Sequence, residues 1–185
     1  MSESQSTARR EVLNRGGWGN GDVYRVRQQG RLVVVKTYAG KPLVIRWIGR
    51  FLLGREKRAY ERLRGLPGIP RVLEWPEPLS LALENIEGER ISNQALASER
   101  GQGIVASLRS LVDAMHARGV FHLDLRNQGN VMVDHSNRAW LLDFASCVML
   151  RRPDGWLSPV ARLCRRIDLY GVSKWAGRAS VERQG

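Results

Sequence analysis

The strongest constraint in this sequence is a set of three polar side chains placed around two short apolar runs. Asp124 and Asn130 come before the run 131–133, and Asp143 follows the run 139–142. A polar segment separates the runs, so they predict the two strands of a β-hairpin. Because the first strand begins where the second one ends, Asn130 and Asp143 are expected to lie side by side at one end of that hairpin.

Oxygen-bearing side chains grouped in this way suit phosphoryl transfer. An acceptor hydroxyl needs a carboxylate that orients it and takes its proton, and Asp124 fits that need. Magnesium prefers hard oxygen ligands from more than one chain position, and Asn130 and Asp143 can share it. Taken singly, Asp143 could equally be a turn residue, and the nearby His122 could be a hydrogen-bonded core histidine.

The order of these residues resembles the protein-kinase-like superfamily: His-x-Asp, then Asn before an apolar strand, then Asp-Phe after the next strand. The resemblance covers most of the chain. It implies an α+β, bilobal protein-kinase-like fold, with an antiparallel sheet and one helix in the N-lobe and a shortened, mainly helical C-lobe. It also implies ATP and Mg2+ as cofactors, Asp124 as the catalytic base, and Asn130 and Asp143 as metal ligands.

Two residues nearer the N-terminus fit the same resemblance. Lys36 ends a valine-rich run and resembles the strand lysine that binds the α- and β-phosphates, while Glu56 resembles the glutamate that pairs with it. Without the resemblance, Lys36 is an edge charge in solvent and Glu56 belongs to a surface charge run.

The expected nucleotide contacts come from two further segments. A glycine cluster before Val23 resembles the loop over the phosphates, where missing side chains allow close backbone approach, although glycine-rich hairpin turns are common. Glu84 and Ile86 fall in the segment that resembles the hinge facing the adenine. The nucleotide contacts that the resemblance implies in the glycine-rich segment are Gly16, Gly17, Gly19, Gly21 and the following Val23.

The sequence departs from the family pattern near the predicted metal ligands. The family's Asn follows its Asp by five residues, a position that Gly129 occupies here, so Asn130 is preferred and Asn127 is the second candidate. The family's Asp-Phe-Gly is Asp-Phe-Ala here, and Ala145 is expected to reduce backbone freedom after the aspartate.

Other positions near Asp124 also follow from the resemblance. Arg126 stands where protein serine/threonine kinases often have a lysine near the γ-phosphate, which implies a catalytic role. Leu123 replaces an arginine that pairs with an activation-loop phosphate, so switching by phosphorylation is not expected. Asp168 resembles a buried helix aspartate that braces the loop around His122, with an ordinary N-cap or surface aspartate as the alternative.

About forty residues follow Asp143, and no Ala-Pro-Glu motif is among them. Most of the peptide-substrate platform of protein kinases is therefore expected to be missing. The chain resembles minimal bacterial-type members of the superfamily, such as Rio-type kinases and the kinases that phosphorylate Kdo or heptose of the lipopolysaccharide core.

The remaining pattern predicts one domain after a flexible leader of residues 1–10, with an N-lobe over about 11–84, a hinge or connector over 85–89 and a C-lobe over 90–185. Further elements are predicted from periodicity, proline breaks and caps. They are strands around 23–26, 32–37, 71–74 and 79–84, a helix over 43–64 interrupted near Gly54, a short helix capped by Ser92, a helix over 104–118 with Gly119 at C′, and a helical region over 158–178.

Composition restricts the partners. Lys and Arg number 30 against 18 Asp and Glu, a net charge of +12 that favours polyanions. No nucleic-acid-binding motif accompanies this charge, so no specific nucleic acid is expected. The polar N-terminus predicts no secretory signal, and two cysteines make no disulfide framework, so a cytoplasmic location is expected.

The segment 41–57 mixes aromatic and aliphatic residues with arginines and lysines. This composition suits an anionic membrane surface, which would place the protein peripherally at the inner membrane. The alternative is that its apolar residues pack against the lysine-bearing sheet.

The sequence therefore predicts a kinase that moves the γ-phosphate of ATP to a hydroxyl, with a lipopolysaccharide-core or other glycan as the first candidate acceptor. A serine/threonine protein kinase and a nucleotide-binding pseudokinase are the alternatives.

Overall fold

The computed structural model describes residues 10–17, 19–150 and 159–180, and their fold is α+β. The predicted leader falls outside this range except for Arg10. The chain divides into two compact units. The first comprises the residues up to Lys57 together with Arg71–Asn85, and the second comprises Arg58–Pro70 together with the residues from Ile86 onward. None of the helices in the described ranges has an apolar stretch long enough to cross a bilayer.

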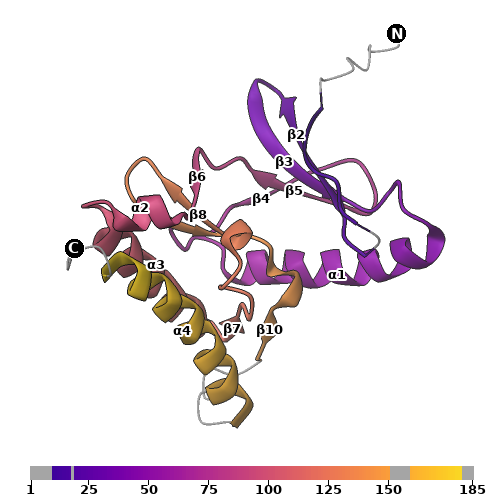
Figure 1. The fold of residues 1–185 in the computed structure, drawn as a ribbon. Helices are drawn as coiled ribbons and strands as arrows, with labels where there is room; N and C mark the ends of the chain where they lie inside the picture. The colour runs from indigo at the N-terminus through magenta and orange to yellow at the C-terminus, as the bar shows by residue number, and fades with distance from the viewer. Residues whose placement is uncertain (1–9, 18, 151–158, 181–185) are drawn as a thin grey trace. The chain divides into compact units, whose positions relative to one another are not determined.

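The first unit contains an antiparallel five-stranded sheet in the order β1-β2-β3-β5-β4, which confirms the predicted N-terminal sheet (Figure 1). Side chains at odd-numbered positions of the central strand, such as Val33 and Val35, are buried on one face, and Lys36 belongs to the other face. Gln29 and Gly30 both have positive φ and close the β2–β3 hairpin. The strands are β1 (Glu11–Asn14), β2 (Asp22–Gln28), β3 (Arg31–Thr37), β4 (Val72–Leu73) and β5 (Ser80–Glu84).

Helix α1 (Leu43–Arg62) is continuous, so the predicted interruption near Gly54 is wrong. One glycine inside a helix costs only about 1 kcal/mol relative to alanine, and the flanking residues Leu53 and Glu56 are buried and fix the helix. Gly49 allows the helix to approach the sheet, because a Cβ at this position would overlap the ring of Tyr38.

These two glycines of α1 give a matched pair of variants. Gly49→Ala is expected to lower the free energy of unfolding by about 1–3 kcal/mol, because the added methyl group must displace a buried tyrosine. Gly54→Ala is expected to raise it by up to about 1 kcal/mol, because its Cβ enters open space and the helix loses less backbone entropy. Urea unfolding followed by circular dichroism measures both, and equal effects of the two substitutions would contradict the packing described for Gly49.

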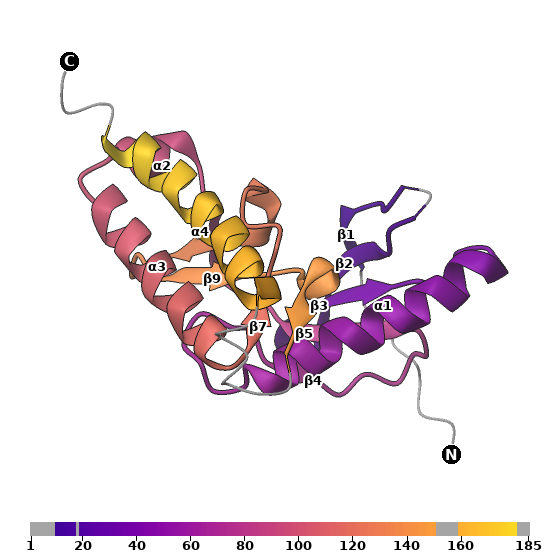
Figure 2. The ribbon, with the colours of Figure 1, turned by 90° about the horizontal axis from the view of Figure 1, so that it is seen from below.

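The second unit has two small sheets and a pair of helices, α3 and α4. The two helices run alongside each other (Figure 2). Helix α3 spans Gly101–Ala117, in agreement with the helix predicted over 104–118. Gly119, just after the helix, has a φ of 68°, and its N–H donates to the His116 carbonyl. Ser92 caps α2 (Asn93–Ala97) by accepting from Ala95 N at 3.1 Å. Helix α4 spans Pro159–Ser180. These predictions are confirmed within the described residues.

The sheets of the second unit include strands that the sequence did not predict. β6 (Gly88–Arg90) pairs with β8 (Val131–Asp134), so the predicted connector over 85–89 is wrong in its last two residues. β7 (Val120–Phe121) pairs with β10 (Val148–Met149). Two- and three-residue strands have no detectable alternation, and only their tertiary partners define them.

The predicted hairpin is confirmed: β8 pairs with β9 (Ala139–Leu141), and the turn between them runs from Asp134 to Arg138. Burial raises the pKa of Asp134, but hydrogen bonds from Ser136, Trp140 and Arg138 outweigh it and bring the pKa to about 2. The carboxylate therefore stays ionised at neutral pH and fixes the turn between the two strands.

Candidate active site

In the first unit, Lys36 of β3 and Glu56 of α1 form an ion pair, with 2.9 Å between Nζ and Oε2. The Glu56 side chain is 2% exposed and that of Lys36 is 14% exposed. A charge removed from water in this way needs an opposite charge close by, so each residue fixes the other. Val23 of β2 lies directly opposite Lys36 in the sheet, which puts these two predicted nucleotide contacts side by side.

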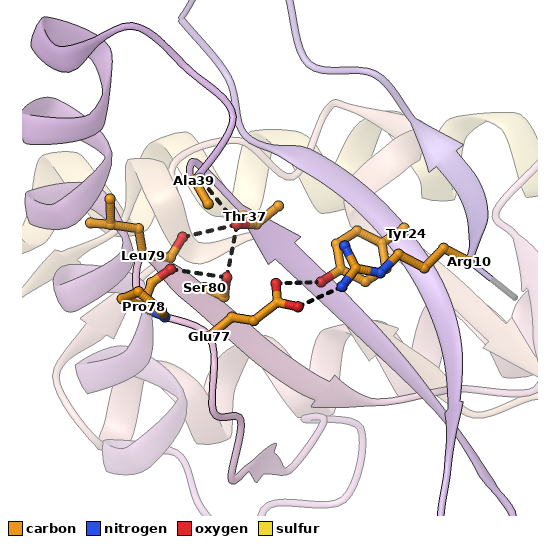
Figure 3. A network of polar contacts seen from close by, with 8 residues as sticks. All are labelled: Arg10, Tyr24, Thr37, Ala39, Glu77, Pro78, Leu79 and Ser80. Carbon is orange, nitrogen blue, oxygen red and sulfur yellow. Dashed lines mark hydrogen bonds and ion pairs between the residues drawn. The ribbon is translucent and has the colours of Figure 1, made fainter. Parts of the chain in front are cut away.

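A polar network anchors the strand end that follows Lys36 (Figure 3). Ser80 Oγ donates to Thr37 Oγ1 at 2.8 Å, and Thr37 Oγ1 donates to the Leu79 carbonyl at 3.3 Å. In the same network, Tyr24 donates to Glu77 at 3.2 Å. Burial raises the pKa of Tyr24, and the Glu77 carboxylate raises it further, so the hydroxyl stays a donor. The network ties Thr37, the last residue of β3, to Ser80, the first residue of β5.

The glycine cluster forms the loop between β1 and β2. Lys41 Nζ donates to the Gly16 carbonyl at 2.8 Å and to Asp22 Oδ1 at 2.9 Å, and Gly16 N donates to the same carboxylate at 3.0 Å. A Cβ on Gly16 or Gly21 would overlap neighbouring atoms, whereas Gly17 and Gly19 face open space. Sequence reasoning missed Asp22, which directly follows the glycine-rich segment, and Lys41, which lies beyond β3 and reaches this loop only through the fold.

In the second unit, Asp124 and Asn130 are joined directly. Asn130 Nδ2 donates to Asp124 Oδ2 at 2.8 Å and to the Asp124 carbonyl at 3.0 Å. A 3-10 turn, η1 (Gln128–Asn130), accommodates the additional residue between them. Leu142 N donates to the Asn130 carbonyl at 2.9 Å, which brings the start of β8 next to the residue before Asp143.

The amide orientation of Asn130 is suited to a metal ligand. Both of its Nδ2 partners are acceptors, so Oδ1 points away from Asp124 and can bind a cation. Asn127 is less suited, because its Oδ1 already accepts from Gly129 N at 2.9 Å. In the described ranges, no three His, Cys, Asp or Glu side chains gather into a group that could hold a metal ion, and the roles of Asn130 and Asp143 as metal ligands are still predictions.

Asp143 has left-handed backbone angles, φ 56° and ψ 77°. Its N–H donates to the hydroxyl of Tyr60 at 3.0 Å, and the Tyr60 ring packs edge-on against Phe144. Ala145 belongs to the following 3-10 turn, η2 (Phe144–Ser146), so the positive φ lies at the aspartate and not at the position where the family has glycine. The expected loss of backbone freedom at Ala145 therefore has no consequence for this conformation. Tyr60 was not predicted from the sequence.

Asp168 of α4 is fully buried and braces the loop before Asp124. Its carboxylate accepts from His122 N at 2.9 Å, from Leu123 N at 2.7 Å and from His116 Nε2 at 2.8 Å. Leu123 has φ of 68°, a conformation that costs a non-glycine residue about 1–2 kcal/mol. The bracing suggested by the resemblance is confirmed, and the surface alternative for Asp168 is wrong.

A solved kinase structure shares the architecture that holds these contacts. A crystal structure of the Rio2 kinase–ADP/Mg2+–phosphoaspartate complex from Chaetomium thermophilum superposes with a TM-score of 0.66 at 15% identity, over 91% of this chain and 56% of that one. The fold is protein-kinase-like. No family model matches the chain.

Two curated sequences are similar to this kinase-like chain. A probable casein kinase I homolog of Encephalitozoon cuniculi is 27% identical over 155 residues, 77% of this chain and 46% of the relative. A protein of Oryza sativa subsp. japonica, named as a CBL-interacting protein kinase, is 26% identical over 159 residues, 79% of this chain and 38% of the relative. The chain thus spans less than half the length of the curated relatives it matches.

Three further predicted site residues, Glu84, Ile86 and Arg126, differ in exposure and in their contacts. Glu84 ends β5, and its carboxylate accepts from Arg71 Nε at 2.5 Å. Ile86 is half-buried and belongs to the second unit, where it follows Asn85, the last residue of the first. Arg126 is exposed, and its carbonyl accepts from Lys174 at 3.4 Å. The structure thus gives each unit its own group of predicted site residues, whose roles are still predictions.

Proposed function

We propose that this protein is an ATP-dependent phosphotransferase that moves the γ-phosphate of ATP to a hydroxyl group. One contact carries the proposal: Asn130 donates through Nδ2 to the Asp124 carboxylate at 2.8 Å, so its amide oxygen does not face that carboxylate. This arrangement serves a general base beside a metal ligand, in a chain whose fold is kinase-like. The ADP and Mg2+ of the Rio2 complex support the choice of nucleotide and metal.

The proposed roles follow from the side chains. Asp124 orients the acceptor hydroxyl and takes its proton as the new oxygen–phosphorus bond forms. The bond between the γ-phosphorus and the bridging oxygen breaks, and its electron pair leaves with ADP. Lys36, fixed by Glu56, binds the phosphates, and Arg126 stabilises the transferred group. Bound Mg2+, held by Asn130 and Asp143, would neutralise phosphate charge.

For the acceptor, we propose a glycan hydroxyl, with the lipopolysaccharide core as the first candidate, and a cytoplasmic location at the inner membrane surface. Support comes from the basic, partly apolar segment 41–57. A serine/threonine protein kinase is the second candidate, and the names of both curated relatives favour it. The retained set Lys36, Asp124, Asn130 and Asp143 weighs against a pseudokinase.

Transfer from labelled ATP to a panel of protein, free-sugar and lipid-glycan acceptors tests this function, with Asp124→Asn as the matched inactive variant. We expect label on a glycan with wild type and a loss of about a hundredfold or more in the variant, because the general base is gone. Label on protein alone would replace the acceptor assignment. Bound nucleotide with no transfer to any acceptor would instead identify a pseudokinase.

A further inference from the structure

Five large apolar side chains form one exposed face on the N-terminal part of α1. Leu43 is 77% exposed, Trp47 is 79% exposed and Phe51 is 63% exposed. Their spacing of four residues puts them on one side of the helix, and Val44 and Ile48 widen that side. We call these five residues the outer face of α1. Single exposed apolar residues are ordinary, but a contiguous group of this size marks an interaction surface.

The sheet does not account for these side chains. The opposite side of α1 carries Gly49, which packs against Tyr38, the buried Leu53, and Glu56, which pairs with Lys36 of the sheet. The alternative in which the apolar residues of this segment pack against the sheet is therefore wrong for Trp47 and Phe51, which are exposed.

The charges beside the outer face have one sign. From Lys41 to Arg55 the sequence contains no Asp or Glu, and the basic residues Arg46 and Arg50 lie within the same turns as Trp47 and Phe51. Arg50 is exposed, and Arg46 is half-buried. Each Lys or Arg near an anionic lipid surface contributes attraction, and tryptophan and phenylalanine favour the region between headgroups and acyl chains.

We propose that the outer face of α1 binds the surface of an anionic membrane, with Trp47 and Phe51 inserted between the headgroups and the arginines paired with lipid phosphates. The net charge of +12 opposes docking of a second copy through the same basic face. A convex helix surface also suits a fluid lipid layer, which needs no complementary groove. This inference names the surface that would give the proposed membrane location, and it does not depend on phosphoryl transfer.

Sedimentation of the full chain with lipid vesicles tests the proposal, using phosphatidylcholine alone and phosphatidylcholine mixed with phosphatidylglycerol. Wild type is expected to bind the mixed vesicles at low salt and to be released as salt screens the charges. Trp47→Ser combined with Phe51→Ser is expected to weaken vesicle binding by about tenfold or more, because two aromatic side chains no longer insert into the membrane. Arg46→Gln combined with Arg50→Gln is expected to weaken it by a similar factor on mixed vesicles.

The matched control is Leu163→Ser combined with Tyr170→Ser, which removes two exposed apolar side chains from the arginine-rich helix α4. This variant should bind like wild type, and so should Asp143→Asn, which removes the proposed metal-binding carboxylate but keeps a residue type that tolerates the left-handed backbone beside Tyr60. Equal weakening by the α4 variant, or no binding to anionic vesicles at low salt, would overturn the assignment. Lipid-independent self-association that only the α1 variants abolish would overturn it in favour of a second copy.

Discussion

Replacing Lys36 by methionine is expected to lower phosphate transfer by about a hundred- to a thousandfold, because the nucleotide loses a cation aimed at its phosphates. The same substitution leaves Glu56 buried without its partner at 2.9 Å. Removing one partner of a buried ion pair destabilises a fold by about 3–5 kcal/mol, so a loss of activity in this variant alone does not separate chemistry from unfolding. Transfer from labelled ATP and urea unfolding must therefore be measured on the same preparation.

A double variant separates the two effects. Lys36→Met combined with Glu56→Gln removes both charges, and this is expected to restore much of the lost stability while transfer stays low. Lys57→Met, at an exposed lysine next to Glu56, is the control that should keep both activity and stability. Normal turnover in the stable double variant would refute the proposed role of Lys36.

Asp143 offers an independent check on the same chemistry in the second unit. Asp143→Asn keeps a residue type that tolerates the left-handed backbone at φ 56° but removes the carboxylate. The side chain is exposed, so stability should be nearly unchanged. Transfer should fall by about a hundredfold or more, because the proposed metal loses its charged ligand.

The sequence predicted the strands and turns that carry Lys36, Asn130 and Asp143, because each of them lies next to a short apolar run that is bounded by turn residues. The valine-rich strand before Lys36 and the hairpin between Asn130 and Asp143 are such cases. The clamp of Lys41 on Asp22 and the hydroxyl of Tyr60 on Asp143 could not be predicted in this way. These contacts join residues that only the tertiary fold brings together, so the spacing of apolar residues along the sequence does not predict them.

The backbone at Asp143 shows a second limit of sequence reasoning. Ala145 stands where the family has glycine, so the sequence predicts a loss of backbone freedom at that position. The positive φ lies two residues earlier, at Asp143. The 3-10 turn that contains Ala145 suits alanine well, and the Asp143 side chain caps it by accepting from Ala145 N at 3.3 Å. Residue type alone does not reveal which peptide in a short turn takes the strained conformation.

Asp168→Ala is expected to cause the largest loss of stability in the second unit, about 3–5 kcal/mol in the free energy of unfolding. It leaves the buried N–H groups of His122 and Leu123 without their acceptor, and His116 Nε2 loses its partner as well. The left-handed conformation of Leu123 then has no hydrogen bond to hold it, so the Asp124 loop should also lose its geometry. Asp113→Ala is the matched control, because its partly exposed ion pairs with Arg109 and Arg165 contribute at most about 1 kcal/mol. Urea unfolding of both variants measures the difference, and similar midpoints for the two would show that the buried carboxylate does not brace the loop.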